Sequence, residues 1–289
     1  MVSRIPLLHA ARQGKHAAFV AKRKGVRLAR RVENRVGQGL FPLLHPAGSY
    51  VFDPVRYKRS FLFDTVHATP GPFVPRVFTF WTGDNEMSPT RLANLDRLRA
   101  DIGLEVVVVT PDNLRDWVLP DDPLHPSYPH LSLVHRADYL RAYFFHHHGG
   151  GYCDIKRPMH SWANAAREFA VDHQGWYAGS PMRLAWLGWY AGPLGQDLRR
   201  NFASLACNGA GLARPGSPLT AEWLAEVERR MSAWAARLEK YPGGVRGETE
   251  GYPFSWNDLL NRIHHPLSMK YSAHIRRSTV FDIDVRDYE

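Results

Sequence analysis

The sequence predicts an α/β domain whose sheet begins with parallel strands, and a basic helical arm that precedes this domain. Short strand-like runs alternate with helix-length segments after Pro75, which is the pattern of a parallel α/β sheet. Glycine and proline separate these segments. With 289 residues, of which 44% are hydrophobic, the chain is long enough to bury a substantial core.

The positive charge of the chain is confined to its first residues. Residues 1–37 hold ten Lys or Arg and one acidic residue, which accounts for the whole net charge of +9. We assign residues 1–45 to a basic helical arm, 46–75 to a connector that wraps onto the core, and 76–289 to the α/β domain. The arm suits an anionic membrane surface or nucleic acid. A solvated extension, or one that packs on a partner subunit, accounts for it equally.

Several function classes are disfavoured by composition. The longest run free of charged residues contains Pro42 and Pro46 and is too short to span a bilayer, and no secretory signal is recognisable. No nucleic-acid-binding fold signature accompanies the arm, so nucleic acid is not an expected partner. Cys153 and Cys207 lack metal-ligand spacing and are expected to be buried thiols. We therefore expect a cytoplasmic protein, with peripheral contact to the inner membrane face through the arm.

The elements follow from apolar spacing and from capping residues. Before the middle of the chain we expect a buried strand over Val77–Trp81, a helix from Ser88–Pro89 to Gly103, a strand covered on both faces over Leu104–Val109, a short helix over 114–118, a helix from about His135, and a strand over Tyr152–Ile155. The second half is mixed, with strands over 176–178 and 205–213 and helices over 220–239 and 256–264, the last capped by Ser255.

The segment 135–156 carries the strongest functional signal. It predicts a helix, a glycine break at 149–151, and a strand that delivers Asp154 to its end. Asp138 and Arg141 are three residues apart, so they neighbour each other on the flank of the apolar face of the helix. Ligand sites of open α/β sheets lie at strand ends. We therefore expect Asp138, Arg141 and Asp154 to converge on one spot; a plain surface ion pair at 138 and 141 is the alternative.

This segment resembles the sugar-nucleotide signature of GT-A glycosyltransferases of the DxD-sugar-binding and capsular-polysaccharide-synthesis type. Those families carry an Asp-x-x-Arg helix, a Tyr-x-Gly-Gly break and an aromatic-x-Asp-x-Asp strand end. Three further pieces match in the same order. Phe80-Trp81-Thr82-Gly83 resembles the first strand, residues 208–211 with 214–218 resemble the later acceptor-side strand and turn, and residues 252–256 resemble the closing loop.

The resemblance implies a GT-A fold, with a Rossmann-like nucleotide-binding half and a mixed sheet. It implies a retaining glycosyltransferase that moves a sugar from a nucleotide-diphosphate donor to a glycan or glycolipid acceptor in surface polysaccharide biosynthesis. Asp138, Arg141 and Asp154 would be catalytic, and Asp154 would hold a divalent cation, Mn²⁺ or Mg²⁺. The residues implied in donor binding are Phe80, Trp81, Thr82, Gly83, Tyr152, Lys156, Asn208 and Trp256. Without the resemblance, Trp81 would be expected in the core.

One departure from the family pattern bears on the chemistry. Lys156 stands where the second aspartate of the motif is expected, and a protonated lysine cannot ligate a cation. Asp154 then holds the metal alone, or Lys156 itself neutralises the diphosphate, or the protein binds sugar nucleotides or glycans without turnover. We rank weak or substituted metal use above loss of catalysis.

Other clusters are expected to be structural. His146, His147 and His148 point about 100° apart on a helix and cannot share one ion, so we expect them to favour the helix C-terminus through its dipole. Residues 282–284 spell Asp-Ile-Asp but lack the helix and glycine break, which indicates a tail or an edge strand. The tryptophans expected in the core are Trp162, Trp223 and Trp234.

Overall fold

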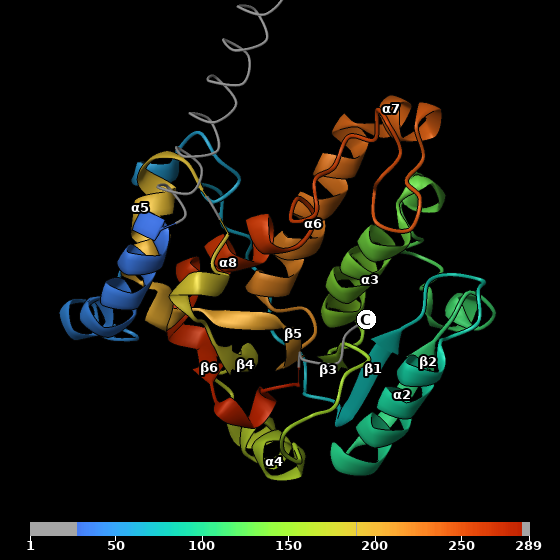
Figure 1. Ribbon diagram of the computed structural model, residues 1–289, viewed down its shortest axis with the longest axis horizontal. Coiled ribbons are helices and arrows are strands. Elements are labelled where there is room, and N and C mark those ends of the chain that lie inside the picture. The colour runs from blue at the N-terminus through green and yellow to red at the C-terminus, as the bar shows by residue number, and fades with distance from the viewer. Residues whose placement is uncertain (1–27, 189, 285–289) are drawn as a thin grey trace, which may run out of the picture.

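A mixed six-stranded sheet with helices on both faces forms the body of the protein (Figure 1). The computed structural model describes residues 28–188 and 190–284. The strands are β1 (Arg76–Phe80), β2 (Glu105–Val109), β3 (Gly150–Cys153), β4 (Tyr177–Pro181), β5 (Ala206–Ala213) and β6 (Ile275–Arg277), in the spatial order β2-β1-β3-β5-β4-β6. β1 pairs in parallel with β2 and β3, whereas β5 is antiparallel to both of its neighbours. The predicted α/β class is therefore confirmed.

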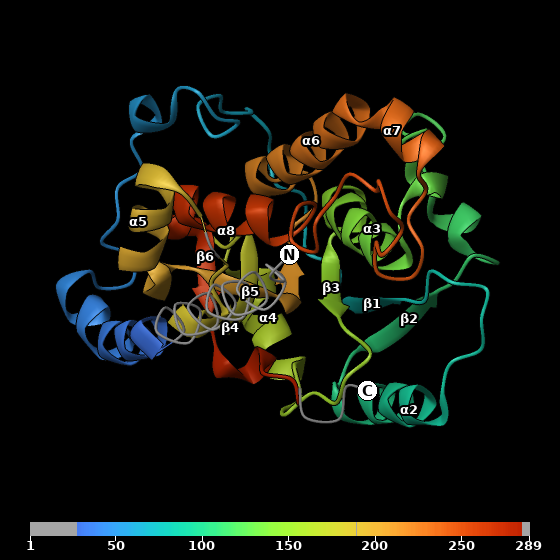
Figure 2. The ribbon, with the colours of Figure 1, turned by 45° about the horizontal axis from the view of Figure 1, so that its top comes forward.

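The helices lie in two layers, one on each face of the sheet. They are α2 (Pro89–Asp101), α3 (Leu133–His147), α4 (Ala163–Val171), α5 (Gly192–Arg200), α6 (Pro218–Ala233), α7 (Ala235–Lys240) and α8 (Asn261–Lys270). Figure 2 shows α3, α6 and α8 over one face and α2 and α4 over the other. Successive strand residues point to opposite faces, so Phe78 and Phe80 join the core under α3, while Val77 joins the core under α2.

The order of the strands reverses direction at β1, between β2 and β3. After β1 the chain crosses through α2 to β2 on one side, and then through α3 to β3 on the other side of β1. In open α/β sheets, ligands bind outside the carboxyl ends of the two strands at which the order changes direction. The residues that follow β1 and β3 are Trp81 and Asp154.

Two glycines carry the chain from α3 directly into β3. The Ser132 side chain caps the start of α3 by accepting a hydrogen bond from the His135 N–H. At the other end Gly149 has φ +63° and its N–H donates to the Phe144 carbonyl over 2.9 Å. Gly150, at φ +83°, then begins the strand. These left-handed conformations favour glycine, and they place Asp154 only a short strand away from the helix.

Three expected elements differ in the structure. The strand expected over 104–109 begins at the exposed Glu105 and lies at the edge of the sheet. Val107 packs against the core under α3, and Val106 and Val108 pack against the core under α2, so both faces are partly covered. The helix expected over 220–239 breaks at Trp234, which is 44% exposed rather than in the core, whereas Trp162 and Trp223 are fully buried as predicted.

The last helix begins later than expected. The Ser255 N–H and hydroxyl both donate to the Asp258 carboxylate, over 2.6 and 2.8 Å, which closes a turn instead of capping a helix. α8 therefore starts at Asn261, and it continues through Pro266 to Lys270 rather than ending at His264.

The chain before β1 packs along the α5 and α8 side of the body. Residues 1–27 of the expected arm lie outside the described residues; residues 28–44 are helical and lie beside α5, in blue in Figure 1. In the connector, Arg56 and Tyr57 both donate to the buried Asp197 of α5. Within the described ranges every helix is too short or too polar to span a bilayer.

Candidate functional site

Arg141 and Asp154 meet at the end of β3. Arg141, on α3, donates from Nη2 to Asp154 Oδ1 over 3.3 Å and to the Tyr152 hydroxyl over 2.9 Å. Its Nη1 donates to the Asn208 carbonyl on β5 over 2.8 Å. Because β5 is antiparallel, its first residues lie at the edge where β3 ends. The guanidinium therefore joins a helix and two strands at one point.

An aromatic platform lies beneath this arginine. The guanidinium carbon of Arg141 is 4.0 Å from the centroid of the Tyr152 ring, in cation–π contact. Tyr152 also stacks on Phe80, with ring centroids 5.1 Å apart, and its hydroxyl donates to Asp154 Oδ1 over 2.8 Å. Phe80 and Tyr152 are thus brought into the cluster, as supports of Arg141 and Asp154.

Asp154 is held as a carboxylate by cations on both sides. Lys156 Nζ lies 3.0 Å from Asp154 Oδ2, while Arg141 and Tyr152 occupy Oδ1. Burial acts to raise the pKa of Asp154, but Lys156 and Arg141 outweigh it and the pKa is lowered. Asp154 keeps 22% of its side chain exposed, which leaves an approach from outside.

Asp138 is the least satisfied member of the cluster. Its side chain is 5% exposed, and Oδ1 lies 3.9 Å from Arg141 Nη2. Among the described residues, Asp138 Oδ2 and Arg141 Nε find no hydrogen-bond partner. A buried polar atom without a partner costs about 1–3 kcal/mol and is rare in folded proteins. Burial raises the pKa of Asp138 to about 7, against the opposing influence of Arg141. Both atoms are buried, so a ligand that brings hydroxyl groups would reach them only after the neighbouring side chains shift.

A chain of amide side chains connects the cluster to a small cavity. Asn208 Nδ2 donates to Asn261 Oδ1, and Asn261 Nδ2 donates to Asn257 Oδ1, each over 2.9 Å. Asn257 and Asn261 line a cavity of about 220 Å³. Trp256, which is 52% exposed, lines the same cavity. Asn208 is thus part of the cluster, whereas Trp256 lies at its rim.

The residues after β1 hold a loop rather than joining the Asp154 cluster. Thr82 Oγ1 donates to the Leu133 carbonyl over 2.7 Å, which fastens this loop to the first turn of α3. A side chain at Gly83 would collide with Asn85 and Leu133. Trp81 is half-buried against the core under α2, and its indole N–H donates to the Asn85 carbonyl over 2.7 Å. This is the face of β1 opposite to Phe80.

His135 and Tyr252 form a further contact that the sequence pattern did not indicate. His135 is buried on α3, and its Nδ1 lies 2.8 Å from the Tyr252 hydroxyl and 3.0 Å from Ser132 Oγ. Its Nε2 lies 3.3 Å from the Ser255 carbonyl. Burial lowers the pKa of His135, so the ring is neutral. This contact holds the loop before α8 against the helix that carries Asp138, and no local periodicity points to it.

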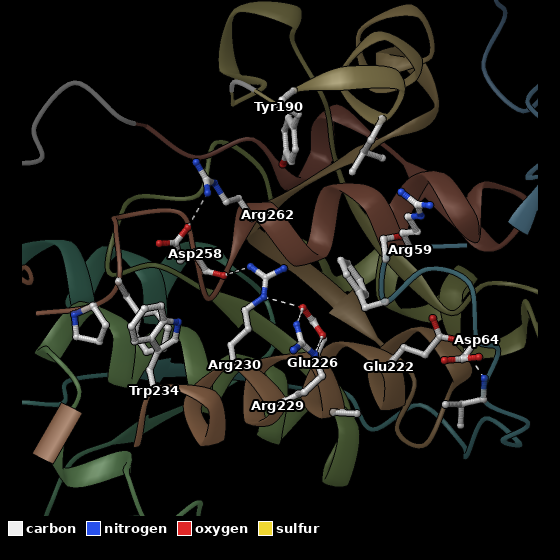
Figure 3. Close-up of a pocket in the computed structure, with 18 residues that line it drawn as sticks. Arg59, Asp64, Tyr190, Glu222, Glu226, Arg229, Arg230, Trp234, Asp258 and Arg262 are labelled. Carbon is white, nitrogen blue, oxygen red and sulfur yellow. Dashed lines mark hydrogen bonds and ion pairs between the residues drawn. The ribbon is translucent and has the colours of Figure 1, made fainter. Parts of the chain in front are cut away.

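A second, larger cavity of about 1040 Å³ lies against α6 and α8 (Figure 3). It shares Tyr190 and Arg262 with the small cavity, so the two adjoin. Figure 3 shows Arg229 and Arg230 converging on Glu226, and Arg262 paired with Asp258. The aromatic side chains of its wall are Phe61, Tyr190, Trp234 and Phe254. The cavity thus combines flat apolar rings with guanidinium donors.

The donor set around Asp154 does not fit a divalent cation. Both carboxylate oxygens are engaged by cationic or hydroxyl donors, and Lys156 stands where a second carboxylate would be needed. Within residues 28–188 and 190–284, no three His, Cys, Asp or Glu side chains group closely enough to hold a metal ion. The positive charge at this strand end comes from Lys156 and Arg141.

The remaining expectations concern the three histidines, the segment 282–284 and the two cysteines. Burial lowers the pKa of all three residues His146–His148, to about 4 for His147, so they are neutral and the expected charge–dipole interaction is wrong. Residues 282–284 pair with 157–159 through an antiparallel bridge, as an edge segment does. Cys153 is buried and Cys207 partly buried, and both are free thiols.

Comparison of the sequence with protein-family models and with curated proteins found no match to either. The residues and geometry described above are therefore the basis on which a function is proposed.

Proposed function

We propose that this protein is a GT-A-fold glycosyltransferase that transfers a sugar from a nucleotide-diphosphate donor to a glycan or glycolipid acceptor. One observation carries the proposal: Asp138, Arg141 and Asp154 converge at the end of β3, and a buried Asp138 oxygen is left without a partner. Sugar hydroxyls donate and accept hydrogen bonds, so they match the orphaned carboxylate oxygen of Asp138 and the orphaned Nε of Arg141.

The leaving group would be neutralised by side chains. Lys156 and Arg141 flank Asp154, so two positively charged side chains meet at the strand end. In the proposed reaction the bond from the anomeric carbon to the phosphate oxygen breaks, and its electron pair stays on the diphosphate. Fixed positive charge at this position stabilises the developing negative charge. Lys156 would thus supply the positive charge that comes, in the resembling families, from a divalent cation held by the two aspartates of the motif.

The acceptor would enter through the two adjoining cavities. Trp256 lines the smaller one, and Tyr190 lines both. Aromatic faces of this kind suit the apolar faces of sugar rings. Neither Asp138 nor Asp154 is placed as a covalent nucleophile. Asp138 is buried and its pKa is raised, and Asp154 is held in ion pairs with Arg141 and Lys156. We therefore propose retention by front-face displacement, in which the leaving phosphate accepts the proton of the acceptor hydroxyl.

The setting we propose is the cytoplasm, in the assembly of a surface polysaccharide or glycoconjugate. The free thiols Cys153 and Cys207 support a reducing compartment.

The test is the release of nucleotide diphosphate from a panel of nucleotide sugars, measured for the wild-type chain and for Asp154→Asn. We expect turnover to fall by about 10²–10³ in the variant, since the carboxylate that positions Lys156 and Arg141 loses its charge. Asp96→Asn, an exposed carboxylate on α2, is the matched control and is expected to be unchanged. The anomer of the product is read by NMR, and an inverted product would refute retention. A folded wild-type chain that turns over no donor in the panel would overturn the proposal of transfer.

The metal requirement is tested separately. If Lys156 neutralises the diphosphate, a chelator leaves turnover unchanged, and Lys156→Asp makes it dependent on Mn²⁺ or Mg²⁺. If a chelator abolishes wild-type turnover, the alternative holds, in which Asp154 binds the divalent cation.

A second candidate function is binding of sugar nucleotides or glycans without turnover. It is favoured by the complete engagement of both Asp154 oxygens. A donor that raises the melting temperature but is never cleaved would identify this function, since a ligand of the folded state stabilises it.

A further inference from the structure

We propose that the helical segment 28–44 docks the protein onto a membrane surface that carries anionic lipids. The contact would be made by an apolar stripe that the rest of the described fold leaves uncovered. The proposal concerns a surface remote in sequence from the Asp154 cluster and does not depend on the proposed enzymatic function. We define the apolar stripe by its six aliphatic residues: Leu28, Val32, Val36, Leu40, Leu43 and Leu44.

The stripe follows the repeat of a helix. Its residues are mostly four apart, with Leu43 one turn after Leu40, so they lie along one side of the segment. Their exposed fractions run from 45% at Leu40 to 78% at Leu43. Single exposed aliphatic residues are ordinary on a protein surface, but a continuous row of them marks an interaction site.

The opposite side of the same segment is fixed to the body. Gly37 is buried, and a side chain there would collide with Leu184 and Phe41. The Leu184 N–H donates to Gln38 Oε1 over 2.8 Å, and Arg199 of α5 donates to Asn34 Oδ1 over 3.3 Å. At 100° per residue, Phe41 lies about 180° from Val32, and Gly37 lies about 140° from it. The stripe is therefore presented outward by a helix that is docked on its other side.

The charges beside the stripe select the kind of partner. Arg31 and Arg35 border the stripe and are exposed, and in the described part of the chain no carboxylate forms an ion pair with either of them. Glu33, the one acidic residue among residues 28–44, is neutralised by Arg199. Helices that combine an apolar side with Lys or Arg on the polar side lie in the plane of an anionic membrane.

This combination favours a lipid surface over the other occupants of such a face. A second copy of the chain would bring like charges together beside the stripe, which is unfavourable. A nucleic acid would satisfy the arginines but leave the aliphatic residues in water. A membrane with anionic headgroups satisfies both the charges and the apolar side chains.

The test is cosedimentation of the full chain with vesicles. We expect the wild type to bind vesicles of phosphatidylcholine with phosphatidylglycerol and not those of phosphatidylcholine alone. Val36→Gln with Leu43→Gln is expected to weaken binding about tenfold or more, since two apolar side chains are lost from the lipid contact. Arg31→Gln with Arg35→Gln is expected to weaken it about fivefold or more for each charge lost near the surface.

Two matched controls use exposed residues elsewhere. Val171 and Val245 are 75% and 55% exposed, so Val171→Gln with Val245→Gln removes two apolar side chains of similar fractional exposure from other surfaces. Arg97→Gln with Arg115→Gln removes the same charge from other surfaces. Both controls are expected to bind like the wild type. Equal binding by the Val36 and Leu43 variant would overturn the proposal.

Insertion is read directly by a fluorophore at position 43. Cys153 is buried and burial raises the pKa of Cys207 to about 12, so a thiol introduced as Leu43→Cys is the reactive one for labelling. We expect a blue shift with anionic vesicles and quenching by lipids that carry a quencher in the acyl chain. A label that shifts only with duplex DNA, or a dimer in sedimentation velocity that Val36→Gln with Leu43→Gln abolishes, would contradict a lipid partner.

Discussion

Arg141 serves the fold and the candidate site at once. Its guanidinium bonds Tyr152, Asp154 and the Asn208 carbonyl, and its side chain is 5% exposed. Only a forked, permanently charged group reaches all of these acceptors, so lysine is not a conservative replacement. Loss of turnover in an Arg141 variant therefore has to be read together with its stability.

Asp138 is expected to make the folded state less stable as the pH rises. Burial raises the pKa of its carboxyl from 3.8 to about 7, with Arg141 opposing and Asp154 adding to the effect. Between these two values the folded protein holds a proton that the unfolded chain releases. The contribution of this proton to stability is full below about pH 4 and is lost as the pH rises through about 7.

The measurement is the free energy of unfolding of the wild type and of Asp138→Asn across this pH range. Since asparagine carries no proton to lose, we expect the wild type to lose stability relative to the variant as the pH rises. Parallel curves would show that Asp138 does not titrate in this window.

At the level of helices and strands, the turn from α3 to β3 is the most constrained junction. Gly149 has φ +63°, and a side chain there would collide with Pro215. We expect Gly149→Ala to lower the free energy of unfolding by about 1–3 kcal/mol, through backbone strain and this collision. Denaturant unfolding monitored by circular dichroism measures the loss.

Gly39 is the matched control for this substitution. It lies in the helical segment 28–44, and a side chain there would meet nothing within 4 Å. Gly39→Ala is expected to be neutral or to stabilise by up to about 1 kcal/mol, because alanine favours a helix. If both substitutions cost the same, the conformation of Gly149 is not what constrains the junction.

Capping residues and helical spacing correctly predicted elements whose position is decided by neighbouring residues in the sequence. Ser88 with Pro89 opens α2, and the spacing of Asp138 and Arg141 before a glycine break correctly brought both toward Asp154. Local patterns failed where a distant contact decides. Asn261 joins Asn208 across 53 positions of sequence, and no periodic signal marks such a pair.

Burial of polar groups was the second source of error. The three histidines after Phe145 were expected to carry charge at the end of α3, but they are half-buried, and this burial lowers the pKa of each. The exposure of Trp234 likewise depends on where α6 ends, and the sequence of α6 does not predict that end.

For the molecule as a whole, a buried ion pair ties the connector to the helical layer. Lys270 of α8 and Glu222 of α6 pair at 2.7 Å with side chains 3% and 5% exposed. Glu222 Oε1 also accepts from the Val66 N–H of the connector over 3.0 Å. We expect Glu222→Gln or Lys270→Met to cost about 3–5 kcal/mol, because each leaves a buried charge without its partner.

The double variant should lose less than the sum of the two single losses, since no buried charge then remains. Thermal unfolding measures all three variants. The exposed pair Asp96 and Arg99, on α2, is the control, and Asp96→Asn is expected to stay within about 0.5 kcal/mol. Strict additivity would mean that the Glu222–Lys270 pair is not coupled.

The anchoring of Arg141 on a main-chain oxygen has a practical consequence for dissecting the protein by mutation. The acceptor at position 208 is the carbonyl, whereas the neighbouring amide that reaches Asn261 is the side chain. Replacing Asn208 with alanine therefore removes the side-chain hydrogen bond to Asn261, whereas the hydrogen bond from Arg141 to the carbonyl of residue 208 remains. A single substitution can therefore alter the small cavity that Trp256 lines and leave the Asp154 cluster intact.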